Sequence, residues 1–205
     1  MQWFANDGGP MLLLPRAAAA AWEGADPPAG RVVVAVTRWD GGADATDYDR
    51  ACDVDAAAGL LPVAGSWAVA LPGDLAGSVA WLPGADPGAL VAVAVAATDD
   101  DSPAFLRRAY GEVAPGAWAT VAAGVDAPAG GLLLLHAASA GADTLVGASG
   151  PDGVAVIGDA LAADARPGRY VIEAAEVARP DAELLFCRLR LAGGAGPAGA
   201  GAPAT

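Results

Sequence analysis

An acidic segment at positions 40–55 holds the densest group of side chains that could take part in chemistry. Six of its sixteen residues are aspartates, and carboxylate oxygens are the ligands that calcium prefers. The rest of a calcium-binding loop is missing, because Asp47-Tyr48-Asp49 continues into Arg50 without a glycine turn or a final bidentate glutamate. Magnesium-dependent chemistry has no further support in the pattern. We therefore expect no metal at this segment.

The same segment is also typical of a loop that recognises another protein. Interface hot spots often combine aromatic and charged side chains, and Trp39 and Tyr48 stand among the aspartates. The alternative is a solvated loop in which only Tyr48 and Cys52 pack against the core. The predicted partner-binding residues are Trp39, Asp40, Asp44, Asp47, Tyr48 and Asp49.

The remaining sequence contains no recognisable catalytic constellation. The single histidine, His136, follows four leucines, and no serine lies in a G-x-S-x-G turn. A lone histidine at the end of a strand is typically structural. The chain has no lysine, which excludes a Walker A phosphate loop, and one histidine with two distant cysteines does not make a typical zinc site. We predict no enzyme activity, no catalytic residues and no cofactor.

An acid-dependent hydrolase that pairs Asp47 with Asp49 is the remaining enzymatic hypothesis. On an extended segment, residues two positions apart point to the same face, but no other residues frame a substrate for this pair. A deep pocket lined by carboxylates with raised pKa values would favour the hydrolase, whereas a flat acidic face would favour protein binding.

The net charge of −13 narrows the classes of partner. Such a chain repels the phosphates of nucleic acids and the anionic surface of a membrane. Its field instead raises the encounter rate with a basic protein, so we expect a basic partner surface. The alternative is that the acidity only provides solubility.

The chain is expected to stay in the cytoplasm. Its first 14 residues lack the basic start of a signal peptide, and Pro10 and Pro15 bracket their only apolar run. The longest uncharged stretch, 56–73, is interrupted by prolines and glycine, so no transmembrane helix is expected. Cys52 and Cys187 lie 135 positions apart, without the spacing of a disulfide framework, and both thiols are expected to be free.

Short apolar runs separated by the 28 glycines and 16 prolines predict a protein rich in strands. Two helices are predicted, a short alanine-rich one at 17–22 and one at 102–113. The second begins with Ser102 as N-cap and Pro103 at the first helical position. Residues 118–125 fit either a helix or a strand. The predicted strands are 11–14, 32–36, 67–71, 79–82, 90–96, 132–135, 154–157, 170–172 and 184–191.

These elements predict an α+β, β-rich fold, a mostly antiparallel sheet with a few short helices in a single domain at 1–191. Residues 192–205 contain only alanine, glycine and proline before a final threonine, so they are expected to form a disordered tail. The G-x-G-x-x-G pattern at 194–199 lies in this tail without a flanking strand or helix, and is a coincidence of composition. The tryptophans expected in the core are Trp3, Trp22, Trp67, Trp81 and Trp118.

Several short motifs occur in an order and spacing that is more specific than any one of them. They are Trp3, Gly8-Gly9-Pro10 with the run 11–15, Trp22-x-Gly24, Asp47-Tyr48-Asp49-Arg50-Ala51-Cys52 with Val54, the run 67–71 with Pro72-Gly73-Asp74, and Pro167-Gly168-x-Tyr170 with the closing strand. In these motifs the chain resembles the immunity protein 21 family. The resemblance covers nearly the whole chain except the tail, and the stretch 98–165 contributes little to it.

This resemblance implies an antitoxin-like protein of bacterial polymorphic toxin systems, encoded beside the toxin that it blocks. It implies a cognate toxin domain as the partner, and the family has no catalytic residues to carry over to this chain. The glycines and Trp22 of the motifs can be explained by the fold alone. We expect an immunity protein that binds and neutralises its toxin by occlusion. The alternative is a non-catalytic accessory module that binds a small ligand or another protein.

Overall fold

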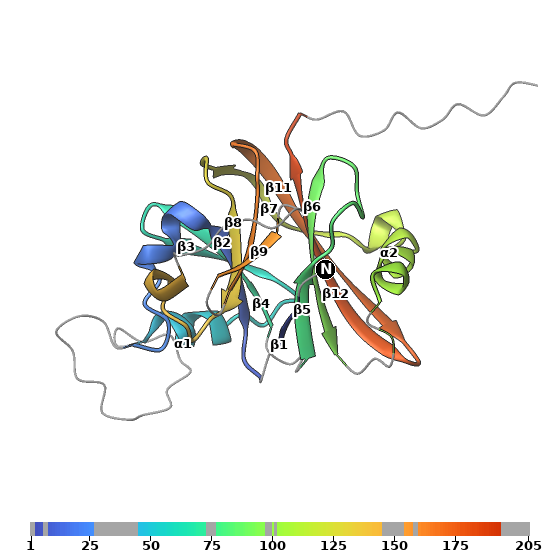
Figure 1. The fold of residues 1–205 in the computed structure, drawn as a ribbon, viewed down its shortest axis with the longest axis horizontal. Coiled ribbons are helices and arrows are strands. Elements are labelled where there is room, and N and C mark those ends of the chain that lie inside the picture. Colours follow the sequence, from blue (N-terminus) through green and yellow to red (C-terminus); the bar gives the residue numbers. More distant parts are fainter. Residues whose placement is uncertain are drawn as a thin grey trace, which may run out of the picture.

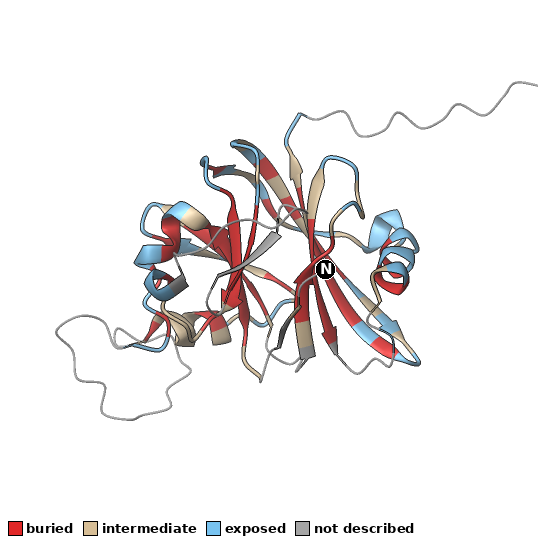
Figure 2. Cartoon of the chain, viewed as in Figure 1, coloured by how far each residue is buried: buried red, intermediate tan, exposed pale blue. Residues whose placement is uncertain are grey.

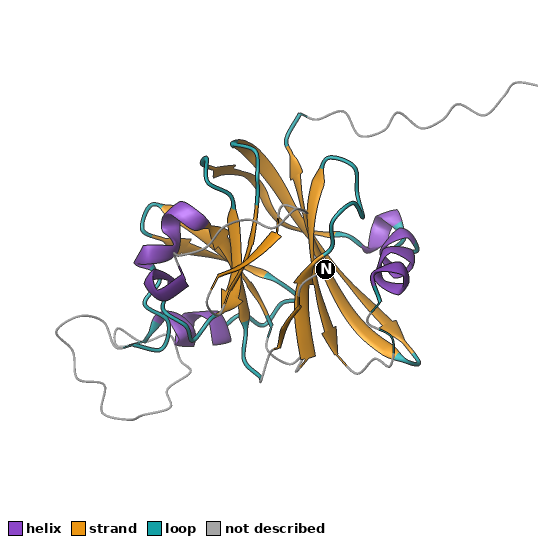
Figure 3. Cartoon of the chain, in the orientation of Figure 1, coloured by secondary structure: helices purple, strands orange, loops and turns teal. Residues whose placement is uncertain are grey.

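The computed structural model describes residues 3–5, 8–26, 45–72, 77–96, 100, 102–144, 154–157 and 160–193. These residues form two six-stranded antiparallel sheets with the helices on their outer sides (Figure 1, Figure 3). The first sheet has the order β1-β5-β6-β12-β11-β7, and the second sheet has the order β3-β4-β2-β8-β10-β9. The expected β-rich, antiparallel fold in a single domain is confirmed.

The bounds of the elements follow from the backbone hydrogen bonds. The strands are β1(Trp3–Ala5), β2(Met11–Pro15), β3(Gly59–Val63), β4(Ser66–Leu71), β5(Gly77–Trp81), β6(Ala89–Ala96), β7(Ala119–Ala127), β8(Leu132–His136), β9(Val154–Ile157), β10(Ala160–Ala163), β11(Gly168–Arg179) and β12(Ala182–Leu191). The helices are α1(Asp47–Cys52) and α2(Pro103–Gly111), with 3-10 turns η1(Arg16–Ala21), η2(Pro115–Ala117) and η3(Gly141–Thr144).

Three apolar layers hold the sheets and helices together, and the buried residues follow the strands in Figure 2. The layer between the sheets contains Leu13 from the second sheet and Leu185 from the first. A second layer lies on the outer face of the second sheet, where residues such as Leu12 pack under η1 and α1. The third layer lies on the outer face of the first sheet, where Phe186 packs under α2.

Both faces of β2 and β8 are therefore covered, which explains why these strands do not alternate between apolar and polar residues. Successive side chains of a strand point to opposite faces, so a strand between two apolar layers needs an unbroken apolar run. The leucines at 12–14 and 132–135 are all fully buried. Each contributes roughly 1.5–3 kcal/mol relative to an exposed position.

Every predicted strand within the described residues is present, and the prediction at 32–36 lies outside them. The segment 118–125, which fitted either a helix or a strand, is a strand, because β7 covers Ala119–Ala127. β11 has 12 residues, far more than the predicted 170–172. The elements that the sequence did not predict are the strands β1, β3 and β10, the helix α1 and the turns η2 and η3.

The two predicted helices are confirmed in place. The Ser102 side chain accepts a hydrogen bond from the Phe105 backbone N–H at 3.2 Å, and Pro103 opens α2. The apolar side of α2, with Leu106 and Tyr110, packs on the first sheet. The alanine-rich segment at 17–22 forms the 3-10 turn η1.

Tryptophans join the two sheets across the central layer. The Trp81 indole N–H of the first sheet donates to Leu161 O of the second sheet at 3.1 Å. In the opposite direction, the Trp67 indole of the second sheet donates to Asp126 O of the first sheet at 2.8 Å. The expected core positions are confirmed for Trp22, Trp67 and Trp81, which are buried, whereas Trp3 and Trp118 are half-buried beside the α2 layer.

Two further features concern the ends of the domain and the helices. The predicted tail at 192–205 lies outside the described residues from 194 onward, and 192 and 193 form a turn after β12. Among the helices in the described part of the chain, none has the length and apolar character needed to cross a bilayer.

Candidate functional site

Residues 47–52 of the acidic segment form the helix α1, so the predicted loop, whether for recognition or only solvated, is wrong at these positions. Asp53 and Asp55 follow the helix and are exposed. Thr46 is the N-cap of α1, and its hydroxyl oxygen accepts a hydrogen bond from the Asp49 backbone N–H at 3.1 Å. The Asp49 carboxylate in turn accepts from the Thr46 backbone N–H at 2.8 Å. This reciprocal pair is a capping box, in which aspartate takes the usual place of glutamate.

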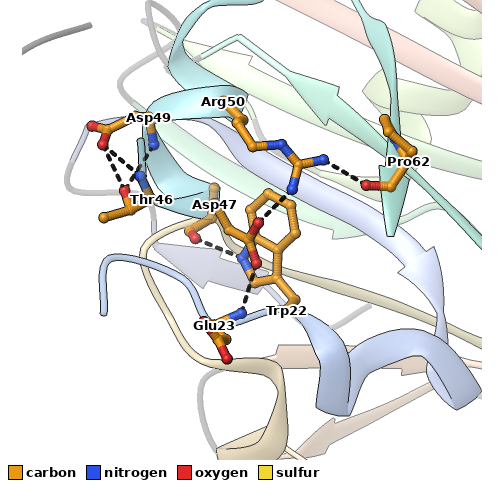
Figure 4. A network of polar contacts seen from close by, with 8 residues as sticks. Trp22, Glu23, Thr46, Asp47, Asp49, Arg50 and Pro62 are labelled. Atoms are coloured by element: carbon orange, nitrogen blue, oxygen red, sulfur yellow. Dashed lines mark hydrogen bonds and ion pairs between the residues drawn. The ribbon is translucent and has the colours of Figure 1, made fainter. Parts of the chain in front are cut away.

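Asp47 and Arg50 fasten α1 to the elements beside it (Figure 4). The Asp47 carboxylate accepts from the Glu23 backbone N–H at 2.8 Å and pairs with the Arg50 guanidinium at 2.5 Å. Arg50 also donates to Pro62 O in β3 at 2.5 Å, and its guanidinium lies 5.9 Å from the centroid of the Trp22 ring. The network joins the chain after η1, the helix α1 and the edge strand β3.

This network leads to a prediction for Asp47. Asp47→Ala is expected to lower the free energy of unfolding by about 2 kcal/mol, because two hydrogen bonds to a charged, largely covered carboxylate are lost. Asp55→Ala is the control, since Asp55 is exposed and should change stability by less than about 0.5 kcal/mol. Urea unfolding followed by tryptophan fluorescence measures both. Equal midpoints for the two variants would contradict the structural role.

The helix also separates the two carboxylates of the hydrolase hypothesis. Residues two positions apart in a helix do not face each other, and Asp47 and Asp49 bind different parts of the chain. Within the described residues, no group of three or more histidine, cysteine, aspartate or glutamate side chains is arranged to hold a metal ion.

The next residue of the motif, Tyr48, packs beside the only histidine. The Tyr48 and His136 rings are stacked, with centroids 6.1 Å apart and planes at 24°. His136 Nδ1 accepts from the Ala138 backbone N–H at 3.2 Å, so the proton of the neutral ring is on Nε2, which lies 2.6 Å from Gly8 O and donates to it. Both ring nitrogens therefore bind the backbone, the structural role expected for this residue.

Gly9 must be a glycine at this contact. Its φ is +93°, and a Cβ atom there would lie 2.7 Å from the Tyr48 hydroxyl oxygen and 3.1 Å from His136 Nε2. The close approach explains one glycine of the motif by the fold alone.

Tyr48 and Cys52 together form one wall of a cleft. Their side chains are hydrogen-bonded to each other. Burial raises the pKa of the Cys52 thiol, with a smaller opposing effect of the bond from Tyr48. Burial likewise raises the pKa of Tyr48, and Cys52 and Asp49 add to the shift. At neutral pH the thiol is protonated, which does not suit a nucleophile.

The cleft has a volume of about 820 Å³ and lies between α1 and the β11–β12 hairpin. Both α1 and the turn of this hairpin lie toward the lower end of the molecule in Figure 1. We call it the hairpin cleft. It is lined by Gly9 and Pro10, by Tyr48, Ala51 and Cys52, by the segment 54–57, by Pro72, and by Glu176, Val177, Ala178, Glu183 and Leu184 of the hairpin.

Strand register brings two glutamates into the hairpin cleft. Glu176 lies on the face of β11 that also carries Ala174, whose side chain packs between the sheets. Glu183 of β12 is paired with Ala178 and is on the same face. This inner face of the hairpin therefore continues the central layer, but with charged residues at its end.

The carboxylates of the hairpin cleft have no cation in the described structure. Asp55, Glu176 and Glu183 are exposed, and none of them forms an ion pair or side-chain hydrogen bond with the described residues. Arg50 is bound to Asp47 and Pro62. Arg179 pairs with Glu112 at 2.6 Å. The negative charge of the cleft is therefore uncompensated by neighbouring arginines.

The predicted partner-binding residues thus fall into three groups. Tyr48 lines the hairpin cleft, whereas Asp47 and Asp49 bind within the domain and do not line it. Trp39, Asp40 and Asp44 lie outside the described residues, so their predicted role stays a prediction.

Sequence reasoning missed the charged residues of the hairpin. A signal for Glu176 exists, because it breaks the apolar inner positions of a strand that otherwise carries Ile172 and Ala174. Asp55 belonged to the acidic segment but was not selected, since nothing local distinguishes it from Asp53.

Comparison with known protein families identifies the family of the chain. The family model described as Immunity protein 21 matches residues 2–183. No curated protein and no solved structure shows a significant match to the chain.

Proposed function

We propose that this chain, which belongs to the immunity protein 21 family, binds a cognate bacterial toxin domain in the cytoplasm and neutralises it by covering its active site. The match over residues 2–183 is the observation that carries the proposal. The partner is a protein, and the part of its surface that meets this chain is basic.

The charge of the chain supports this choice of partner. A net charge of −13 accelerates association with a basic protein. Protection of a cell requires binding on the order of nanomolar or tighter, roughly −12 kcal/mol. An interface of this strength typically covers about 800 Å² on each partner, so the hairpin cleft would be only part of the contact.

The alternative is an accessory module that binds a small ligand, and the size of the hairpin cleft favours it. A volume of about 820 Å³ lies within the roughly 300–1,000 Å³ of small-molecule sites. Such sites are mostly apolar, whereas this one carries three exposed carboxylates without a cation. We therefore prefer a protein partner.

Co-expression with the toxin domain encoded beside the gene tests the proposal. The chain is expected to restore growth of cells that produce this domain, and to elute with it as a complex in size-exclusion chromatography. A toxin domain of an unrelated family is the control and should still kill. If both proteins are soluble and folded but neither rescue nor a complex is seen, the proposal is wrong.

A further inference from the structure

We propose that the hairpin cleft is the docking site for the partner, and that it receives arginine or lysine side chains from a protruding segment of the toxin domain. The proposal rests on the proposed function and adds to it the surface that binds and the chemistry of the group that is bound. It shares Tyr48 with the sequence-based expectation, which placed the contact on Trp39, Asp40, Asp44, Asp47, Tyr48 and Asp49, and it differs from that expectation at the other residues.

The walls of the hairpin cleft come from two separate parts of the fold. The inner face of the β11–β12 hairpin forms one wall, with Glu176 and Glu183. Tyr48, Cys52 and Asp55 come from the opposite side of the cleft. The cleft thus places apolar and aromatic side chains such as Val54 and Tyr48 beside carboxylates, which suits the alkyl stem and the charged head of a long cationic side chain.

The loss of water from the cleft carboxylates on binding favours a positively charged occupant. Asp55, Glu176 and Glu183 are hydrated when the cleft is free, and any occupant removes part of that water. Covering an ionised carboxylate without a counter-charge is unfavourable, so a neutral or acidic segment would bind weakly. An arginine offsets this cost, because its guanidinium donates two parallel hydrogen bonds to one carboxylate.

Arg179 of β11 and Arg188 of β12 lie on the opposite face of the hairpin from Glu176 and Glu183. On this outer face they pair with Glu112 and Glu173. Arg188 also lies 3.8 Å from the centroid of the Trp118 ring. These arginines hold the α2 side of the first sheet together and are not directed into the cleft. The complementary cation must therefore come from outside the described residues.

The first test compares two variants with the same net charge. The cleft variant carries Asp55→Asn, Glu176→Gln and Glu183→Gln. The control variant carries Glu23→Gln, Asp126→Asn and Asp143→Asn, three exposed carboxylates that do not line the cleft. Binding to the neighbouring toxin domain is measured by surface kinetics over a salt series, with melting temperatures to confirm folding.

The cleft variant is expected to bind at least about 30-fold more weakly, mainly through faster dissociation, since contacts inside an interface control the lifetime of a complex. The control variant should differ from the wild type by about twofold or less, mainly in association at low salt. Equal affinities of the two variants would overturn the cleft proposal alone. If the wild type itself fails to bind, the proposed function fails and the cleft proposal falls with it.

The second test uses Cys52 as a reporter inside the cleft. Cys187 is fully buried, and burial raises its pKa to about 12, so it should not react in the folded protein. Alkylation of Cys52 at mildly alkaline pH, followed by intact mass spectrometry, is expected to be at least about tenfold slower in the complex. Unchanged alkylation in the complex would show an open cleft and overturn the proposal. Slow alkylation in a dimer of the free chain would assign the cleft to a second copy and would also overturn it.

Discussion

Gly24→Ala is expected to lower the free energy of unfolding by about 4 kcal/mol and the melting temperature by roughly 10 °C. Gly24 has φ +67°, a region that costs an L-residue about 1–2 kcal/mol. A Cβ atom there would also overlap Ala138 O and lie 2.7 Å from the carbonyl carbon of Ser139. The backbone cannot easily move away, because Gly24 O accepts from the Tyr48 N–H at 2.9 Å.

Gly84→Ala is the matched control for this prediction. Gly84 has nearly the same φ, +69°, but a Cβ atom would meet no atom within 4 Å. Its loss should be at most about 2 kcal/mol, the conformational cost alone. Thermal unfolding followed by circular dichroism measures both variants. If both variants melt at the same temperature, the contact of the added Cβ atom with the backbone at 138 and 139 does not destabilise the fold. The glycine of the motif Trp22-x-Gly24 then needs another explanation.

The second large effect is expected at the junction of the sheets. Trp81→Ala should lower the free energy of unfolding by about 3–5 kcal/mol, because it empties a buried site between the two sheets. It also leaves Leu161 O without its indole donor. Guanidinium unfolding with two spectroscopic probes measures the loss and shows whether the two sheets still unfold together.

Trp81→Phe separates packing from hydrogen bonding. Phenylalanine keeps most of the apolar volume but has no N–H, so this variant should lose about 1–2 kcal/mol. Trp67 donates in the opposite direction between the sheets, and its Phe variant should behave alike. A Trp81→Phe loss as large as that of Trp81→Ala would mean that the hydrogen bond, not the packing, holds the sheets in place.

Local patterns were enough to predict most of the strands and the helix α2. Apolar runs such as 132–135 and the start signal Ser102-Pro103 act over a few neighbouring residues, so the sequence alone carries them. The family was also recognisable from the order of the short motifs, and the match over residues 2–183 confirms it.

Other elements depended on neighbours far away in the chain. Ala160–Ala163 has little strand propensity and becomes β10 because it pairs with β8 and β9. The helix α1 has six residues, too few to be stable alone, and it depends on contacts with Glu23 and Pro62. The density of aspartates suggested a loop, although Thr46-x-x-Asp49 carried a capping signal for a helix.

Composition and local pattern set the acidity, the β-rich class and the motifs that the fold requires. Which carboxylates are bound within the domain, and which line the hairpin cleft without a cation, depends on how the strands and helices pack. Asp55 and Glu176 are more than 100 positions apart, and they line one cleft because the fold brings the chain after α1 close to the inner face of the β11–β12 hairpin. A register shift of one residue would turn Glu176 and Glu183 to the opposite face. Side-chain direction in a sheet is set by pairing, and pairing is a property of the whole fold.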